Sequence, residues 1–135
     1  MKKLMSYMLS IYGSLKNLHY CVDGPNYYQM HLLADRLIDD INPLEVIDHL
    51  NEHMIGCTGK FVPFKEIMKP DEVCGTSARE AIDGCKLLMQ KAARYIEGFD
   101  FKDEDKGLES YLTALEDNLI TSVGFLSKIT MKGEC

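Results

Sequence analysis

The chain has 135 residues, 46% of them hydrophobic and 27% charged, which is typical of one globular domain covering 1–135. Its net charge of −6, without a basic tail, would repel the phosphate backbone, so we expect DNA binding to be weak or absent. Its five cysteines contain no Cys-x-x-Cys pair and no apolar run is long enough to span a membrane, so the sequence predicts a cytoplasmic protein without a disulfide scaffold.

Apolar residues recur at helical spacing in two stretches of the N-terminal half. The first stretch, from Leu4 to Val22, ends at Gly24-Pro25. The second runs from about 26 to 55, and Pro43 inside it removes one backbone hydrogen bond. We therefore expect a kink or bulge at Pro43. The side chains expected to face the core from this second stretch are Leu33, Leu37, Ile41, Leu44, Ile47, Leu50 and Met54.

The C-terminal half contains a long connection followed by two further helices. Residues 56–76 include one short helical segment that ends by Pro70, and Ser77 with Glu80 reads as a capping box opening the third helix. The fourth helix has an apolar face from Leu108 to Leu126. Two short linkers and one long crossover between the second and third helices predict an all-α, ferritin-like four-helix bundle.

Five side chains of the N-terminal half form a candidate metal site. His31 and Asp35 are four residues apart, so they share one helical face, and Asp48 and Glu52 repeat this spacing. His19 precedes the Gly-Pro break and belongs to a separate helix. Imidazole nitrogen with carboxylate oxygen suits Fe(II), and also zinc or manganese. Because the chain has no Glu-x-x-His sequence, a di-iron site inside the bundle is not expected.

Residues 19–56 resemble the Dps family, the DNA-binding proteins from starved cells. The family pattern reads here as His19-Tyr20, Gly24, Tyr27-Tyr28, His31, Asp35 and then Asp48-His49-Leu50-Asn51-Glu52. The resemblance implies a hollow shell of twelve subunits, a ferroxidase that oxidises Fe(II) with hydrogen peroxide and stores ferric mineral, protecting the cell from oxidative damage. It also implies an intersubunit site, which zinc could occupy as a substitute. His19, His31 and Asp35 would come from one subunit, and Asp48 and Glu52 from its neighbour.

One spacing departs from the family pattern. Asp48 follows Asp35 by thirteen residues, about two more than in the family, and Asn42-Pro43 is the obvious place for the insertion. Without an insertion, the acidic positions of the family would fall on Val46 and Leu50. We therefore assign the second half of the site to Asp48 and Glu52, with Glu45, His49 and His53 as the substitutes that this sequence offers.

Three questions remain open at this point: two concern functions other than a ferroxidase, and one concerns the role of an acidic turn. The first is whether the chain forms a Dps-like structural shell without ferroxidase activity. The second is whether it is a zinc peptidase, because His49-x-x-Glu52-His53 matches the inverzincin pattern, in which two histidines bind zinc and the glutamate activates water. The third concerns an acidic turn, which could line an iron entry pore or could simply be solvated. Its members are Asp100, Asp103, Glu104, Asp105 and Glu109.

Overall fold

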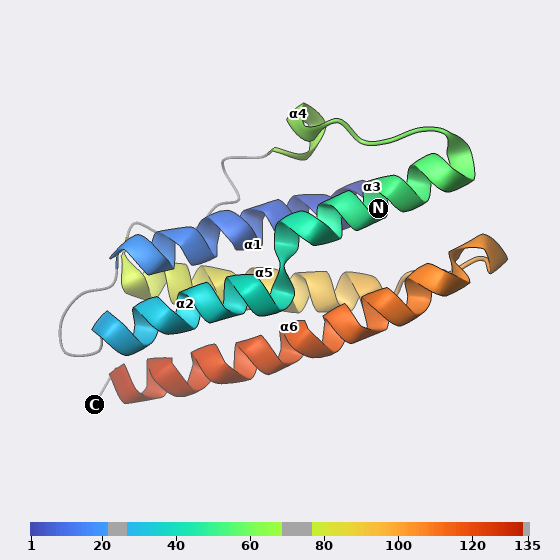
Figure 1. Cartoon of the computed structure of the whole chain (residues 1–135). Coiled ribbons are helices and arrows are strands. Elements are labelled where there is room, and N and C mark those ends of the chain that lie inside the picture. Colours follow the sequence, from blue (N-terminus) through green and yellow to red (C-terminus); the bar gives the residue numbers. More distant parts are fainter. Residues whose placement is uncertain (22–26, 69–76, 134–135) are drawn as a thin grey trace.

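The computed structural model describes residues 1–21, 27–68 and 77–133, and its side chains are described as far as residue 128. Over these ranges the protein is all-α, without strands (Figure 1). The elements are α1 (Lys2–Cys21), α2 (Tyr27–Ile41), α3 (Pro43–Thr58), the short α4 (Phe64–Ile67), α5 (Ala78–Glu97), the 3₁₀ turn η2 (Asp103–Asp105) and α6 (Lys106–Gly133).

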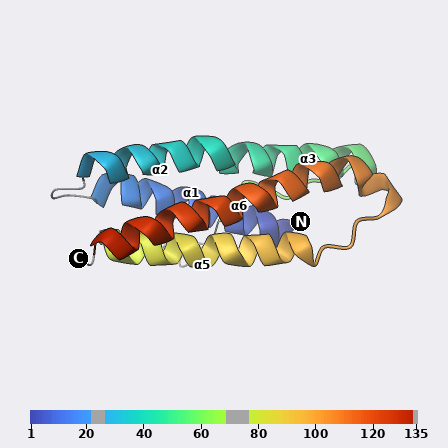
Figure 2. The same ribbon diagram turned by 90° about the horizontal axis from the view of Figure 1, so that it is seen from below.

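The helices pack side by side as a bundle. Helix α1 contacts α2, α3 and α5, while α6 contacts α5 and α2. Helices α2 and α3 follow one another end to end along one side of the bundle (Figure 2). They run antiparallel to α1 and in the same direction as α5, and α6 returns antiparallel to α5 (Figure 1). The chain must therefore cross the length of the bundle between α3 and α5.

The crossover carries α4 along the outer side of α1 (Figure 1). The Ser6 hydroxyl of α1 donates a hydrogen bond to the Ile67 carbonyl at 3.3 Å, and the Ile67 side chain is fully buried. The predicted short helix in this connection is therefore confirmed. Pro70, expected to end it, lies outside the described residues.

The predicted apolar faces of the first, third and fourth helices form the core. Buried side chains include Leu4, Met8, Ile11, Leu15 and Leu18 of α1, Ile82, Cys85, Met89, Ala92 and Ile96 of α5, and Leu108, Leu112, Leu115, Leu119 and Leu126 of α6. Val22 falls outside the described residues. The start of α5 also follows the sequence prediction, because the Ser77 hydroxyl accepts a hydrogen bond from the Glu80 N–H at 3.2 Å.

The predicted second helix is two helices, which corrects the expectation of a bulge within one. Asn42 adopts a left-handed conformation, with φ 50° and ψ 61°, and Pro43 then opens α3. A proline is tolerated in the first helical turn because its missing N–H would have no partner there. The break changes which side chains face inward. Leu44, expected in the core, is 42% exposed, while Val46 is buried, because the left-handed residue resets the phase of the following helix.

Candidate metal centres

Two histidines from different helices meet at one end of the bundle. His19 lies in the last turn of α1 and His31 in the second turn of α2, and the antiparallel packing of these helices brings both to the same end. Their rings stack with centroids 3.7 Å apart. Asp35, one turn beyond His31, joins them, and one potential ligand atom from each of the three lies within 4.8 Å of the others. The structure therefore brings together the first half of the predicted site.

The hydrogen bonds of the two imidazoles determine which nitrogen can bind a metal. His31 Nδ1 donates to the His19 carbonyl at 3.0 Å, and His19 Nδ1 lies 3.3 Å from the His31 carbonyl. Since a carbonyl oxygen only accepts, both Nδ1 atoms carry the proton. Each Nε2 then keeps its lone pair, as in metal sites where the other ring nitrogen is held by the backbone. Asp35 Oδ1 lies 3.1 Å from His19 Nδ1, so this carboxylate accepts from the same N–H, and the Asp35 side chain must turn for its oxygen to join a metal held at Nε2.

The second half of the predicted site lies elsewhere in the same chain. Asp48 and Glu52 are both exposed on α3. Thirteen residues separate Asp35 from Asp48, about 20 Å along a helix axis at 1.5 Å per residue. One chain therefore does not bring these carboxylates to the histidines. If the chain had no insertion, the acidic positions of the family would fall on Val46 and Leu50. These two residues cannot bind a metal, because both are apolar and only 1% and 0% exposed.

The histidines of the peptidase-like pattern have different partners. The His49 ring stacks on Tyr111 with centroids 3.9 Å apart and an interplanar angle of 2°. His53 instead turns toward Asp105. Among the residues that the structure describes, His49 belongs to no cluster of three potential metal ligands. This arrangement favours neither a zinc peptidase nor a role for His49 as a substitute ligand.

A second donor cluster joins the end of α3 to η2, and sequence reasoning did not assemble it. His53 Nε2 lies 2.7 Å from Asp105 Oδ1 and 3.7 Å from Cys57 Sγ. The hydrogen bond from His53 is the main reason why the pKa of Asp105 lies below its ordinary value. The sequence did contain one indication of this cluster, because His53 and Cys57 are four residues apart and therefore share one face of a helix. Asp105 was assigned instead to the acidic turn, in which Asp103 is fully exposed and pairs with Lys106 at 3.7 Å.

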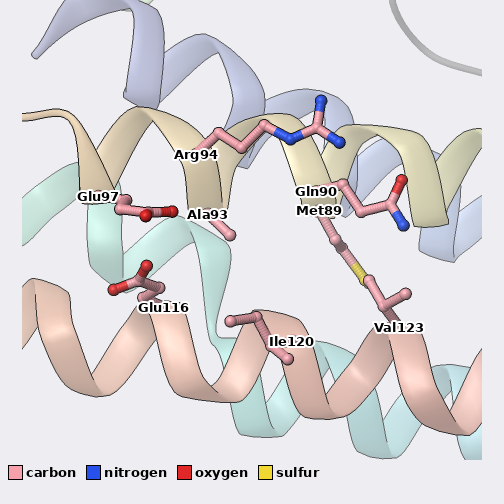
Figure 3. Close-up of a pocket in the computed structure, with 8 residues that line it drawn as sticks. All are labelled: Met89, Gln90, Ala93, Arg94, Glu97, Glu116, Ile120 and Val123. Carbon is pink, nitrogen blue, oxygen red and sulfur yellow. The ribbon is translucent and has the colours of Figure 1, made fainter.

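A groove of about 270 Å³ between α5 and α6 offers different chemistry (Figure 3). Its lining is Met89, Gln90, Ala93, Arg94, Glu97, Glu116, Ile120 and Val123. The ionisable groups in this lining are two carboxylates and one guanidinium, so the groove has neither an imidazole nor a thiol to bind a metal. It is therefore not a third centre of the kind formed by the two clusters.

Comparison of the chain with protein-family models, with curated proteins and with solved structures finds no match. None of the described helices combines the length and the apolar character needed to cross a membrane. The functional interpretation therefore depends on the motif of residues 19–52 and on the geometry of the two donor clusters.

Proposed function

We propose that this protein is a Dps-like ferroxidase and iron store whose substrate, Fe(II), binds at an intersubunit site. The observation that carries the proposal is the convergence of His19, His31 and Asp35, from two helices, within 4.8 Å. The connectivity is also that of ferritin-like bundles, with one long crossover between α3 and α5, which run in the same direction.

The donor set suits the reaction. Two imidazole nitrogens and a carboxylate oxygen are good ligands for Fe(II), while the harder Fe(III) ion prefers the carboxylates. The oxidant that we propose is hydrogen peroxide: two Fe(II) ions each give one electron to one peroxide molecule, whose O–O bond breaks and which takes up two protons to leave as two water molecules. Asp48 and Glu52 of a neighbouring subunit would add negative charge, stabilising the ferric product and guiding it into the shell interior.

The sequence positions of the two halves fit a two-fold axis. Asp35 precedes Ile41 by six residues and Asp48 follows Asn42 by six, while His31 precedes Ile41 by ten and Glu52 follows Asn42 by ten. Two copies of α2–α3 packed antiparallel about the Ile41–Asn42 bond would set each histidine half opposite a carboxylate half. Such an interface is isologous, so every dimer contains two equivalent sites.

The exposed surface of α2 and α3 supports this interface. Tyr28 is 66% exposed, Leu32 47%, Leu44 42% and Ile55 50%, although all four are large hydrophobic side chains. Tyr28 and Ile55 are again equidistant from the Ile41–Asn42 bond, thirteen residues on either side. A second copy of the chain would cover this apolar surface on both sides of the site. The same contacts would form the first step toward a twelve-subunit shell.

Mixing two inactive variants tests whether the site is shared. One variant carries His31→Ala and Asp35→Ala, and the other carries Asp48→Asn and Glu52→Gln. In a mixed dimer, one site has lost both halves and the other has kept both. Random mixing makes about half the dimers mixed, so about one quarter of the sites should regain Fe(II) oxidation by hydrogen peroxide. The measurement is the oxidation rate after co-refolding, with light scattering to confirm assembly.

Other outcomes separate the alternatives. If both variants assemble and the mixture stays inactive while the natural protein oxidises iron, the intersubunit site is wrong. If the natural protein assembles but oxidises iron no faster than buffer, the chain is a structural shell without ferroxidase activity. A monomer in solution would exclude both the shared site and the shell.

A further inference from the structure

The cluster of His53, Cys57 and Asp105 joins two parts of the chain that are far apart in sequence. His53 and Cys57 lie one turn apart near the end of α3, and Asp105 closes η2 just before α6. One ligand atom from each lies within 4.8 Å of the others. The His53 and Asp105 side chains are 19% and 14% exposed, whereas Cys57 is exposed and leaves the cluster accessible from solvent.

The orientation of these groups excludes a catalytic triad. In a triad the acid holds one ring nitrogen of the histidine, and the nucleophile faces the other. Here the Asp105 carboxylate and the Cys57 sulfur both face His53 Nε2, at 2.7 and 3.7 Å. Because His53 Nε2 donates its hydrogen to the Asp105 carboxylate, that nitrogen has no free lone pair to accept the thiol proton. Three donors that converge on one point are instead the geometry of a cation site.

The distances and donor types select the cation. With Zn–N and Zn–O near 2.1 Å and Zn–S near 2.3 Å, a tetrahedral zinc ion separates nitrogen from oxygen by about 3.4 Å and sulfur from nitrogen by about 3.6 Å. The observed sulfur–nitrogen separation of 3.7 Å already fits, and the nitrogen–oxygen pair must open by roughly 0.7 Å. A thiolate disfavours magnesium and calcium, which prefer oxygen ligands.

We propose that His53, Cys57 and Asp105 bind a zinc ion, with water in the fourth position. This site is separate from the iron site and does not depend on the iron proposal. Binding breaks the S–H bond of Cys57, whose proton goes to water, and the Nε2–H bond with which His53 donates to Asp105, whose proton moves to Nδ1 or to water. Zn–S, Zn–N and Zn–O bonds form in their place, with no change in oxidation state. The thiolate and the carboxylate balance the charge of the ion, and the carbonyl end of α3 adds a favourable dipole. The ion would fasten the end of α3 to the segment that leads into α6.

Cobalt(II) is the probe, because a cobalt–thiolate bond gives a charge-transfer band in the near ultraviolet. The experiment uses the full chain carrying His31→Ala and Asp35→Ala, so that the iron site does not compete. We expect one cobalt ion per chain with a thiolate band, and full displacement by one equivalent of zinc. Cys57→Ser should abolish the band, and Asp105→Asn should weaken cobalt binding at least tenfold.

Asp103→Asn is the matched control, because it removes a fully exposed carboxylate two residues away that pairs with Lys106 and does not belong to the cluster. It should leave cobalt binding unchanged. Circular dichroism and thermal unfolding establish that each variant is folded, and zinc should raise the melting temperature of the parent but not of Cys57→Ser. The proposal is overturned if the band persists in Cys57→Ser, if Asp105→Asn and Asp103→Asn bind cobalt equally well, or if the folded parent shows no thiolate band.

Discussion

Replacing His31 by asparagine separates the two roles that the structure gives to its ring. The Asn Nδ2 atom occupies the place of the His Nδ1 atom, so it can still donate to the His19 carbonyl, whose distance from His31 Nδ1 is 3.0 Å. The substitution removes Nε2, the nitrogen that keeps a lone pair for a metal. His31→Asn should therefore keep the local structure and lose the ligand.

The expected magnitudes follow from these contacts. Histidine, asparagine and valine have similar helix propensities, so that term cancels among the variants. His31→Asn loses the ring stacking on His19, about 1 kcal/mol. His31→Val loses the hydrogen bond as well and should be less stable by about another 1 kcal/mol. The Asn and Val variants should both bind metal at least tenfold more weakly. Removing a residue that only hydrogen-bonds to a metal ligand already costs about tenfold in affinity, and these variants remove the ligand itself.

Two measurements check this reasoning. Urea unfolding gives the stability of each variant, and anaerobic equilibrium dialysis with Fe(II) gives its affinity. All proteins carry Cys57→Ser, so that the second cluster does not contribute. Unchanged affinity in His31→Asn would show that Nε2 is not a ligand. Equal stability of the Asn and Val variants would show that the hydrogen bond to the His19 carbonyl does not hold the ring.

Three further predictions concern the helix break, the proposed interface and the second cluster. Asn42→Ala should lower the free energy of unfolding by about 1–2 kcal/mol, because alanine tolerates φ 50° poorly, and Asn42→Gly should be milder in the same urea experiment; equal losses would contradict this explanation. Leu44→Glu should dissociate the assembly while circular dichroism stays that of the folded chain, and light scattering that still shows the full assembly would place the interface elsewhere. The hydrogen bond from His53 lowers the pKa of Asp105 in the folded protein. The ion pair therefore stabilises the fold fully above the ordinary aspartate pKa of about 3.9. This stabilisation is lost as the pH falls through the lower pKa of the folded state. With a chelator present, the stability difference between the parent and His53→Ala should shrink over this acid range, and a difference independent of pH would refute that role for the pair.

The second helix illustrates where sequence reasoning stopped. Asn42-Pro43 marked an irregularity, but a proline inside a helical pattern fits a kink, a bulge or a new helix equally well. The left-handed conformation of Asn42 decides among them, and it depends on how the chain on both sides packs against α1. The same packing moved Leu44 to the surface and placed Val46 in the core.

The sequence by itself determined most of the helices and one half of the proposed iron site. Apolar residues at helical spacing must bury one face, so the bundle follows from the pattern, and the Gly24-Pro25 pair between His19 and His31 predicted that the two histidines belong to separate helices. Only the tertiary structure decided which nitrogen of each ring is held by a carbonyl, and only it joined Asp105 to His53 and Cys57. That contact spans fifty-two residues, and helical periodicity carries no information about which helix ends meet.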